Sequence, residues 1–370
     1  MTLGRREFFG AVAAAATLPQ FSCSRTPAAS NSKLGMPGLF PGRVVSVKHP
    51  GSLVAEAFQA GPIQAMMRKG MMELTGAPDW VAAWRMFVEP GDVVGIKLNP
   101  VGMPDVVSCA EVVREIIAGL QAAGVKTKDI VAYDRYRKQF LKAGFDKWLP
   151  EGVRWSWAAE DYETVQLGMD GYDDKHYMEM NLTQPGQDSR APHVRRSHVA
   201  KFLTQQVNKL VNLPVLKHHQ SAGVTLALKN LSHGLVNNVN RSHSTSTANA
   251  CGIFIPAVVS TPMIRDKTVL HVLDGILGMY HGGPGGRKGK YLWVNHTLYF
   301  STDPVALDKI CWGIIDAKRV EKGMQTVALS KPDADSTFLN CQPEHIELAG
   351  GLGLGVWDDQ KIVRKSFELT

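Results

Sequence analysis

The 370-residue chain has few cysteines, and no two of them are close together. No C-x-x-C motif occurs, and the five thiols are Cys23, Cys109, Cys251, Cys311 and Cys341. This spacing excludes an in-chain ferredoxin module and a zinc ribbon, because both need closely spaced thiolates. After residue 18 the chain also lacks an apolar run of membrane-spanning length. We therefore expect no transmembrane helix in the mature chain.

Several well-known motifs are missing as well. The sequence contains neither a Walker P-loop nor an H-E-x-x-H pair. Its net charge of +7 comes from basic residues spread along the chain, without any motif that reads RNA or DNA. These features argue against nucleic acid as a partner, and a small anionic ligand explains the Lys and Arg residues equally well. With 44% hydrophobic residues, the chain has enough apolar material for a sizeable core.

The first segment of the chain has the features of an export signal. Arg5 and Arg6 precede an apolar stretch over residues 8–18, which Pro19 ends. An arginine pair before an apolar run too short to span a bilayer is typical of a twin-arginine signal peptide, here expected over residues 1–30. The twin-arginine translocase would then export the folded protein to the periplasm. Lipid attachment at Cys23 is an alternative to simple cleavage.

The rest of the chain predicts a single α/β domain over residues 43–370, after a linker over 31–42. Short apolar runs bounded by turn residues predict buried strands at 44–47, 93–98, 130–134, 209–213, 269–273 and 298–300. Apolar residues spaced along one face predict a helix over 110–123, ended by Gly124.

The order of these elements indicates the fold class. A strand, a helix and a second strand in succession predict a parallel, Rossmann-like crossover. We therefore expect a mostly parallel or mixed sheet that is covered by helices. Residues from about 155 to 200 combine several aromatic residues with many charges, which predicts an irregular insertion over one end of the sheet.

Polar residues follow four of the expected strands. In open α/β sheets, ligands bind at the carboxyl ends of the strands, and a charge buried there needs a partner. We therefore expect Lys97 or Lys217 to face Asp134, Asp274 or a ligand. The candidate residues at these strand ends are Lys97, Asn99, Asp134, Arg135, Lys217, His218, His219 and Asp274.

The segment over residues 213–234 is the most informative. It reads as a strand, then a short loop with one Lys and two His residues, then a helix that begins near Ser221. The free N–H groups at the start of such a helix attract anions. Lys229 and His233 are four residues apart and would share a helix face, with Asn230 beside them.

Adjacent His218 and His219 would point to opposite sides of an extended chain, so only one of them is expected to face the site. Neutral imidazole is the most common metal ligand, and His218, His233 and His243 are candidates for a divalent metal site. Structural histidines held by hydrogen bonds are the alternative.

Two further segments carry possible ligand contacts. The glycine-rich run over residues 281–290 can direct backbone N–H groups at an oxyanion, and Arg287 adds positive charge to it. A simple exposed loop is the alternative. Asp303 precedes Pro304 at the predicted start of a helix, so it is expected to be an N-cap as well as a candidate ligand contact.

Four phrases in the sequence resemble one known family. LPVLKHH-x-x-AGVTLALKN, GDVVGIKLN, VLDGI and STDPVALDKI are similar to the domain-of-unknown-function 362 family, in a form with a twin-arginine signal and without a ferredoxin module. The resemblance covers residues from about 43 to about 355. Some members are described as iron-sulfur associated, but this chain lacks the cysteines, so we expect no intrinsic cluster. The resemblance implies a fold and a site but no settled activity.

Together these patterns predict a periplasmic enzyme or cofactor-dependent protein that acts on a small carboxylate or phosphate. The residues expected to act in catalysis are Lys217, His218, His219 and Lys229. Those expected to contact the ligand are Lys97, Asn99, Asp134, Asn230, Asp274, Arg287 and Asp303. A non-catalytic binding protein for an anion or metal is an alternative, and so is a redox component with an iron-sulfur partner.

Overall fold

The computed structural model describes residues 33–285 and 289–370. The expected signal peptide over 1–30, with Cys23, and the expected ligand contact Arg287 lie outside the described residues. Within the described part, no helix is both long enough and apolar enough to cross a bilayer.

Ten strands form the central sheet of the described chain. They are β1 (Arg43–Lys48), β4 (Val94–Lys97), β5 (Ile130–Tyr133), β6 (Arg154–Ser156), β9 (Lys209–Asn212), β10 (Val215–His219), β11 (Gly223–Val224), β12 (Thr268–Met279), β13 (Leu292–Ser301) and β14 (Val363–Glu368). Their order is β14-β1-β13-β12-β9-β4-β5-β6, with β10 beside β12 and β11 beside β10. Two small antiparallel pairs join β2 (Leu53–Val54) to β3 (Ala57–Phe58) and β7 (Tyr172–Glu179) to β8 (Arg196–Ala200).

The helices follow the strands along the chain. They are α1 (Ala60–Thr75), α2 (Trp80–Arg85), α3 (Ala110–Ala122), α4 (Arg137–Lys142), α5 (Phe145–Trp148), α6 (Pro192–Arg195), α7 (Ala227–Gly234), α8 (Cys251–Val259), α9 (Pro262–Lys267), α10 (Pro304–Glu321) and α11 (His345–Gly351). Short turns of 3-10 or π type cover Pro50–Ser52, Thr127–Asp129, Phe202–Gln206, Asn240–Ser242, Val327–Leu329 and Asp359–Lys361.

The sheet is mixed and mostly parallel, which confirms the predicted fold class. β4 pairs in parallel with β5 and β9, and β12 pairs in parallel with β9 and β10. β13 is antiparallel to both of its neighbours, β1 and β12. The six strands expected from the sequence are all present, although β12 and β13 extend well beyond the predicted runs.

The first predicted crossover, β4-α3-β5, is also confirmed as parallel. α3 buries its apolar stripe, including Val113, Ile116 and Leu120, and the chain turns at Gly124 with a positive φ of 105°. A residue with a side chain is strained at such a φ, so glycine ends this helix.

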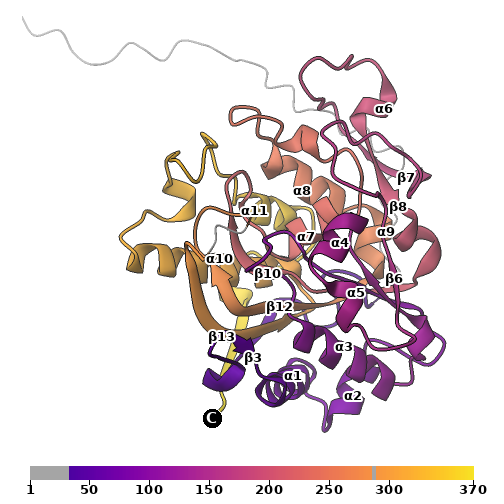
Figure 1. The fold of residues 1–370 in the computed structure, drawn as a ribbon, viewed down its shortest axis with the longest axis vertical. Helices are drawn as coiled ribbons and strands as arrows, with labels where there is room; N and C mark the ends of the chain where they lie inside the picture. The colour runs from indigo at the N-terminus through magenta and orange to yellow at the C-terminus, as the bar shows by residue number, and fades with distance from the viewer. Residues whose placement is uncertain (1–32, 286–288) are drawn as a thin grey trace, which may run out of the picture.

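Helices cover both faces of the sheet, because side chains along each strand alternate between two cores. In β5, Ile130 and Ala132 belong to one core, whereas Val131 and Tyr133 belong to the other. α1, α2 and α3 pack in the first core, and α7, α8, α10 and α11 pack in the second. Figure 1 shows the two groups of helices on either side of the strands. Full burial of each Val, Ile or Leu stabilises the fold by roughly 1.5–3 kcal/mol.

The sheet divides at Pro214, and this division positions the site. Before it, β9 lies between β4 and β12, and the last bond to β4 runs from Leu213 N–H to the carbonyl of Lys97 (3.0 Å). Proline has no N–H to continue such a ladder. β10 then continues along β12 and pairs on its other side with β11 rather than β4. A gap therefore opens between the carboxyl end of β4 and β10.

The prediction that a helix begins near Ser221 is wrong. His219 pairs with Gly223 in a tight β10–β11 hairpin, in which Gly223 has a φ of 77°. The helix, α7, begins only at Ala227. The insertion expected over about 155–200 does cross this end of the sheet, and it contains the antiparallel β7–β8 pair.

Candidate functional site

A cavity of about 390 Å³ lies at the carboxyl ends of β4, β5 and β10, beside α7. Its lining is formed by Lys97, Asn99, Pro100, Val101, Asp134, Arg135, Tyr136, Gln139, Tyr162, Gln166, His219, Thr225, Lys229, Asn230, His233, Gly234, Val239, Asn240, His243 and Pro284. This volume is typical of a site for a small molecule. The site residues expected at the ends of β4, β5 and β10 therefore meet around one cavity. Lys217 and His218 are the exceptions.

Lys97 forms a buried ion pair at the base of the cavity. Its Nζ lies 2.6 Å from Asp134 Oδ1 and also donates to the carbonyl of Leu98. Gly234, at the end of α7, makes room for this side chain, because a Cβ there would lie only 2.0 Å from Lys97 Cε. The charge of Lys97 is thus already balanced by the protein.

Lys217 lies behind the cavity wall rather than in it. Its Nζ donates to Asn99 Oδ1 (2.8 Å), and Asn99 Nδ2 donates to Asn230 Oδ1 (3.0 Å). The side chain is fully buried, and its hydrogen-bond acceptors in the described chain are Asn99 Oδ1 and the carbonyl of Val106. Burial, reinforced by repulsion from Lys97 and Lys229, lowers the pKa of Lys217 to about 7. Lys217, one of the two lysines expected to be catalytic, is therefore separated from the cavity by the amide of Asn99.

Lys229 does line the cavity, and its ammonium group has no hydrogen-bond partner within the described part of the chain. The residue is 4% exposed. Burial lowers the pKa of Lys229 to about 8, with Arg135 acting in the same direction and Cys251 opposing it. An amine with this pKa is present in both protonation states near neutral pH. It can therefore hold an anion or exchange a proton with it.

Arg135 adds a second unbalanced cation. Its guanidinium donates to the Tyr172 hydroxyl (3.0 Å), to Gln166 Oε1 (3.0 Å) and to the carbonyl of His233 (3.3 Å). All three acceptors are neutral. Gln166 comes from the insertion and also accepts from the backbone N–H of Val239 (3.0 Å), so it ties the insertion to the cavity wall.

The cavity is therefore strongly positive. Among the lining residues that the structure describes, Asp134 is the only carboxylate, and Lys97 already neutralises it. Lys229 and Arg135 remain unbalanced, with Lys217 behind them. Burying an ionised group without a counter-charge is costly, and an anionic ligand would supply one.

His219 offers the cavity a hydrogen-bond donor. Its Nδ1 accepts from the backbone N–H of Ser221 (3.2 Å) and of Ala222 (3.4 Å). In a neutral imidazole the other nitrogen then carries the hydrogen, so the ring keeps an Nε2–H. Burial lowers the pKa of His219 well below its usual range, which keeps the ring neutral. It is suited to binding an anion rather than to accepting a proton.

His218 does not reach the cavity. It alternates with Lys217 and His219 along β10 and faces the other side, where its ring centroid lies 5.2 Å from that of His281. This outcome follows from the period of two in a strand. The expectation that one of the adjacent histidines faces the site holds, with His219 in that place.

Two expected ligand contacts are also elsewhere. Asp274 accepts the backbone N–H groups of Cys109 (2.9 Å) and Ile276 (3.2 Å), which joins β12 to the start of α3. Asp303 is the N-cap of α10 and also accepts the N–H groups of Gly42 (2.9 Å) and Val356 (2.8 Å). The oxygens of both carboxylates are occupied by backbone donors, so these residues stabilise the fold around the site.

α7, which carries four cavity residues, is held by a carboxylate from α10. Asp308 accepts from the N–H of Ala227 (2.7 Å) with one oxygen and from that of Leu228 (2.9 Å) with the other. Burial raises the pKa of Asp308 to about 8, and the two backbone N–H donors act in the opposite direction. The free N–H groups that the sequence suggested for an anionic ligand are thus used by the protein itself.

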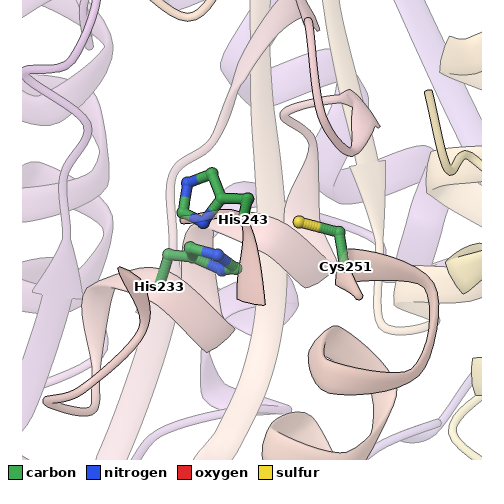
Figure 2. Close-up of side chains that lie close together, drawn as sticks. All are labelled: His233, His243 and Cys251. Atoms are coloured by element: carbon green, nitrogen blue, oxygen red, sulfur yellow. The ribbon is translucent and has the colours of Figure 1, made fainter. Parts of the chain in front are cut away.

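Two cavity histidines lie next to a cysteine. His233, His243 and Cys251 each offer one ligand atom, and these atoms lie within 4.8 Å of one another. Figure 2 shows the two rings one above the other, with the sulfur directed toward them. The metal ligands expected from the sequence were His218, His233 and His243. His218 lies on the far side of β10, and the third member of the cluster is Cys251 instead.

The comparisons with known proteins identify the family. A model described as domain of unknown function (DUF362) matches residues 94–313, more than half of the chain. The chain belongs to the DUF362 family. The matched region contains every described residue of the cavity lining. None of the curated proteins matches the chain.

Among solved structures, a protein from Thermotoga maritima is similar to this DUF362 chain, with 12% identity and a TM-score of 0.41. The match covers 74% of this chain and 61% of the other, so the DUF362 chain spans about three fifths of that protein's length.

Several site residues of this DUF362 protein escaped prediction. Arg135 was expected at a strand end beside Asp134, but no ligand contact was assigned to it. Gln166 and Tyr162 lie in the insertion, which has no periodicity to place them. Cys251 and Asp308 contact residues in other segments of the chain, and a single sequence carries no signal for such contacts.

Proposed function

We propose that this chain is an enzyme, or a cofactor-dependent protein, that acts on a small carboxylate or phosphate bound in the cavity of about 390 Å³. One observation carries the proposal. The cavity buries the cations of Lys229 and Arg135, and its single described carboxylate is already paired with Lys97. An anion would remove this imbalance.

The neutral donors around the cavity support the same ligand class. Asn99 is fixed by a hydrogen bond to Asn230, Asn230 is fixed by one to Asn212, and His219 presents its Nε2–H. Amide and imidazole N–H groups bind carboxylate and phosphate oxygens without adding charge. Such fixed donors provide orientation, which a flexible ammonium group alone does not.

Lys229 is the residue that we assign to proton transfer. An acid–base catalyst works best when its pKa is near the working pH, and the pKa of about 8 meets that condition. Lys229 also touches the cavity directly, whereas Lys217 is behind Asn99 and Lys97 is held by Asp134. The observed geometry therefore favours one catalytic lysine out of the three.

The test uses the anions sulfate and succinate as probes and the substitution Lys229→Met. We expect both anions to bind the wild-type protein by calorimetry, and the variant to bind at least roughly tenfold more weakly, which is about 1.4 kcal/mol. Lys331→Met, at an exposed lysine, is the matched control and should bind like the wild type. Equal affinity in the wild type and Lys229→Met would remove the proposed role of this lysine.

Catalysis is tested separately by incubating the protein in D₂O with small carboxylates that have acidic α-hydrogens, followed by NMR. We expect deuterium incorporation that Lys229→Met abolishes and that His219→Gln slows, with His218→Gln as the control on the opposite side of β10. Binding of the anions without any exchange or turnover would instead identify a non-catalytic binding protein.

We also propose that the protein reaches the periplasm by the twin-arginine route, on the basis of Arg5, Arg6 and the apolar run that follows them. The route carries folded proteins, which suits a domain with a preformed internal site.

A further inference from the structure

The cluster of His233, His243 and Cys251 lies at the edge of the cavity, where α7, the turn Asn240–Ser242 and α8 meet. Both histidines line the cavity, and the cysteine is fully buried behind them. Three segments that are separated in sequence therefore converge on one point. Figure 2 shows the rings and the sulfur around the same small space.

The hydrogen bonds leave a lone pair at this point. Ser232 Oγ donates to the carbonyl of Lys229 (3.3 Å), so it accepts the hydrogen of His233 Nδ1 (2.9 Å). The lone pair of His233 is then on Nε2, which lies 3.1 Å from Ser242 Oγ. A second-shell bond of this kind fixes the tautomer of metal-binding histidines in general.

Ser242 cannot satisfy every acceptor around it. It has one hydroxyl hydrogen, and the carbonyl of Val239 takes it at 2.7 Å. The same oxygen lies 3.1 Å from His233 Nε2 and 3.0 Å from His243 Nδ1. Because Val239 takes the hydroxyl hydrogen, Ser242 has none left for His233 Nε2. A cation that accepts electron pairs would resolve this shortage of donors.

The setting of Cys251 favours its thiolate once a metal is near. Cys251 is the first residue of α8, so the positive end of the helix dipole acts on its sulfur. The hydroxyls of Ser221 and Ser242 lie 3.6 and 3.8 Å from Sγ. Burial raises the pKa of the Cys251 thiol, while Lys229 and these hydroxyls act in the opposite direction. A bound metal displaces the thiol proton.

We propose that His233, His243 and Cys251 bind a divalent transition-metal ion of borderline softness, such as Zn²⁺, with a further coordination position open to the cavity. Two imidazoles and one thiolate suit Zn²⁺ or Co²⁺ and disfavour Mg²⁺ and Ca²⁺, which prefer oxygen ligands. Three protein ligands with one open position are typical of catalytic rather than structural zinc sites.

This site does not depend on the proposed anion, because the protein itself supplies all three ligands and the hydrogen bonds that orient them. The neighbouring cations Lys229 and Arg135 repel any metal ion, and the Cys251 thiolate offsets part of that repulsion. Only an ion with strong bonds to nitrogen and sulfur would remain bound. The proposal therefore predicts selectivity as well as binding.

The experiment titrates the full chain, reduced and free of metal, with Co²⁺ and follows the absorption spectrum. We expect one equivalent to bind, with a thiolate-to-cobalt charge-transfer band in the near ultraviolet. Cys251→Ser should lose the band, and its affinity should fall by more than about a hundredfold, since loss of a second-shell contact alone costs tenfold to a hundredfold. Cys341→Ser and His193→Gln, outside the cluster, should behave like the wild type.

A second measurement covers the case in which Cys251→Ser fails to fold. His243→Gln should weaken Zn²⁺ binding in equilibrium dialysis, and Zn²⁺ should protect Cys251 of the wild type from alkylation under partial denaturation. The proposal is overturned if the wild type binds no stoichiometric Co²⁺, or if the charge-transfer band persists in Cys251→Ser. Sulfate binding is measured on the metal-free protein, so failure of the metal site and failure of the anion site are distinguishable.

Discussion

At the residue scale, the lysines expected at the ends of the strands do gather, but they differ in environment. Lys97 is paired with Asp134, Lys217 is bonded to an amide, and Lys229 is unpaired in the cavity. The three lysines therefore lie in three different electrostatic environments. The pKa of a lysine depends on burial and on nearby charges, and it is lowered to about 7 for Lys217 and to about 8 for Lys229.

Anion binding should weaken as the pH rises. Lys217 and Lys229, with pKa values of about 7 and about 8, are charged below these values and neutral above them. Lys217 is influenced by Lys97, Lys229 and Asp134. We expect the affinity for sulfate, whose own charge stays constant, to fall by up to about tenfold per pH unit above a pH of about 8, with proton uptake on binding at that pH.

Calorimetry in buffers of different ionisation enthalpy measures both the affinity and the proton uptake. The Lys229→Met variant should show a flatter profile, because only Lys217 still titrates in this range. An affinity that is constant from about pH 6 to about pH 9 would contradict the assignment of charge to these two lysines.

Prediction from the sequence succeeded at this scale where a residue sits at the end of a strand. Lys97, Asn99, Asp134 and His219 reach the cavity because the ends of parallel strands share one edge of the sheet. It failed for Asp274, because the sequence does not reveal that two backbone N–H groups occupy its oxygens.

At the element scale, α7 depends on a residue 80 positions further along the chain. Asp308 of α10 accepts the first N–H groups of α7, so two of the phrases that resemble DUF362, LALKN and DPVALD, interact directly. The sequence alone did not reveal this contact, since the two partners are far apart in the chain. It also misplaced the start of the helix, because the Gly223 turn that precedes it forms a hairpin.

Replacing Asp308 by Asn should destabilise the protein by about 2–3 kcal/mol. The amide can accept one N–H bond, but its NH₂ group then faces a second backbone donor, which leaves a buried donor unsatisfied. Urea unfolding measures the change. Asp79→Asn, at the exposed N-cap of α2, is the control and should stay within about 0.5 kcal/mol, because Asn is an equally good cap. An unchanged midpoint for Asp308→Asn would show that its two bonds contribute little.

The strand that follows the division of the sheet at Pro214, β10, was not predicted from the sequence. The six predicted strands were found because buried strands carry a clear apolar signal. β10 was missed because its residues Lys217, His218 and His219 are polar, although all are buried. A strand built from polar residues has no apolar pattern to read, and it is this strand that borders the cavity.

At the scale of the whole molecule, the predicted α/β class and the crossover β4-α3-β5 agree with the structure. Local apolar periodicity is enough to predict such units. The position of β13 between β1 and β12, antiparallel to both, was not predicted, because strand order depends on contacts between distant segments.

Export should depend on the arginine pair itself. Replacing Arg5 and Arg6 by lysines keeps the charge but removes the guanidinium pair that defines the twin-arginine signal. We expect the precursor to remain in the cytoplasm, as measured by fractionation and immunoblotting. Lys33→Arg, beyond the signal, should leave export unchanged. Equal amounts of the double variant and the wild type in the periplasm would rule out this route.

The pairing of β1 with β14 has a consequence for biosynthesis. The first strand of the domain is hydrogen-bonded in parallel to the last, from Arg43 opposite Val363 to Lys48 opposite Glu368. The ribosome must therefore synthesise residues 363–368 before this edge of the sheet can close. The N-terminal segment emerges long before that moment. A translocase that accepts unfolded chains would compete with completion of the sheet, whereas one that transports finished proteins leaves time for it.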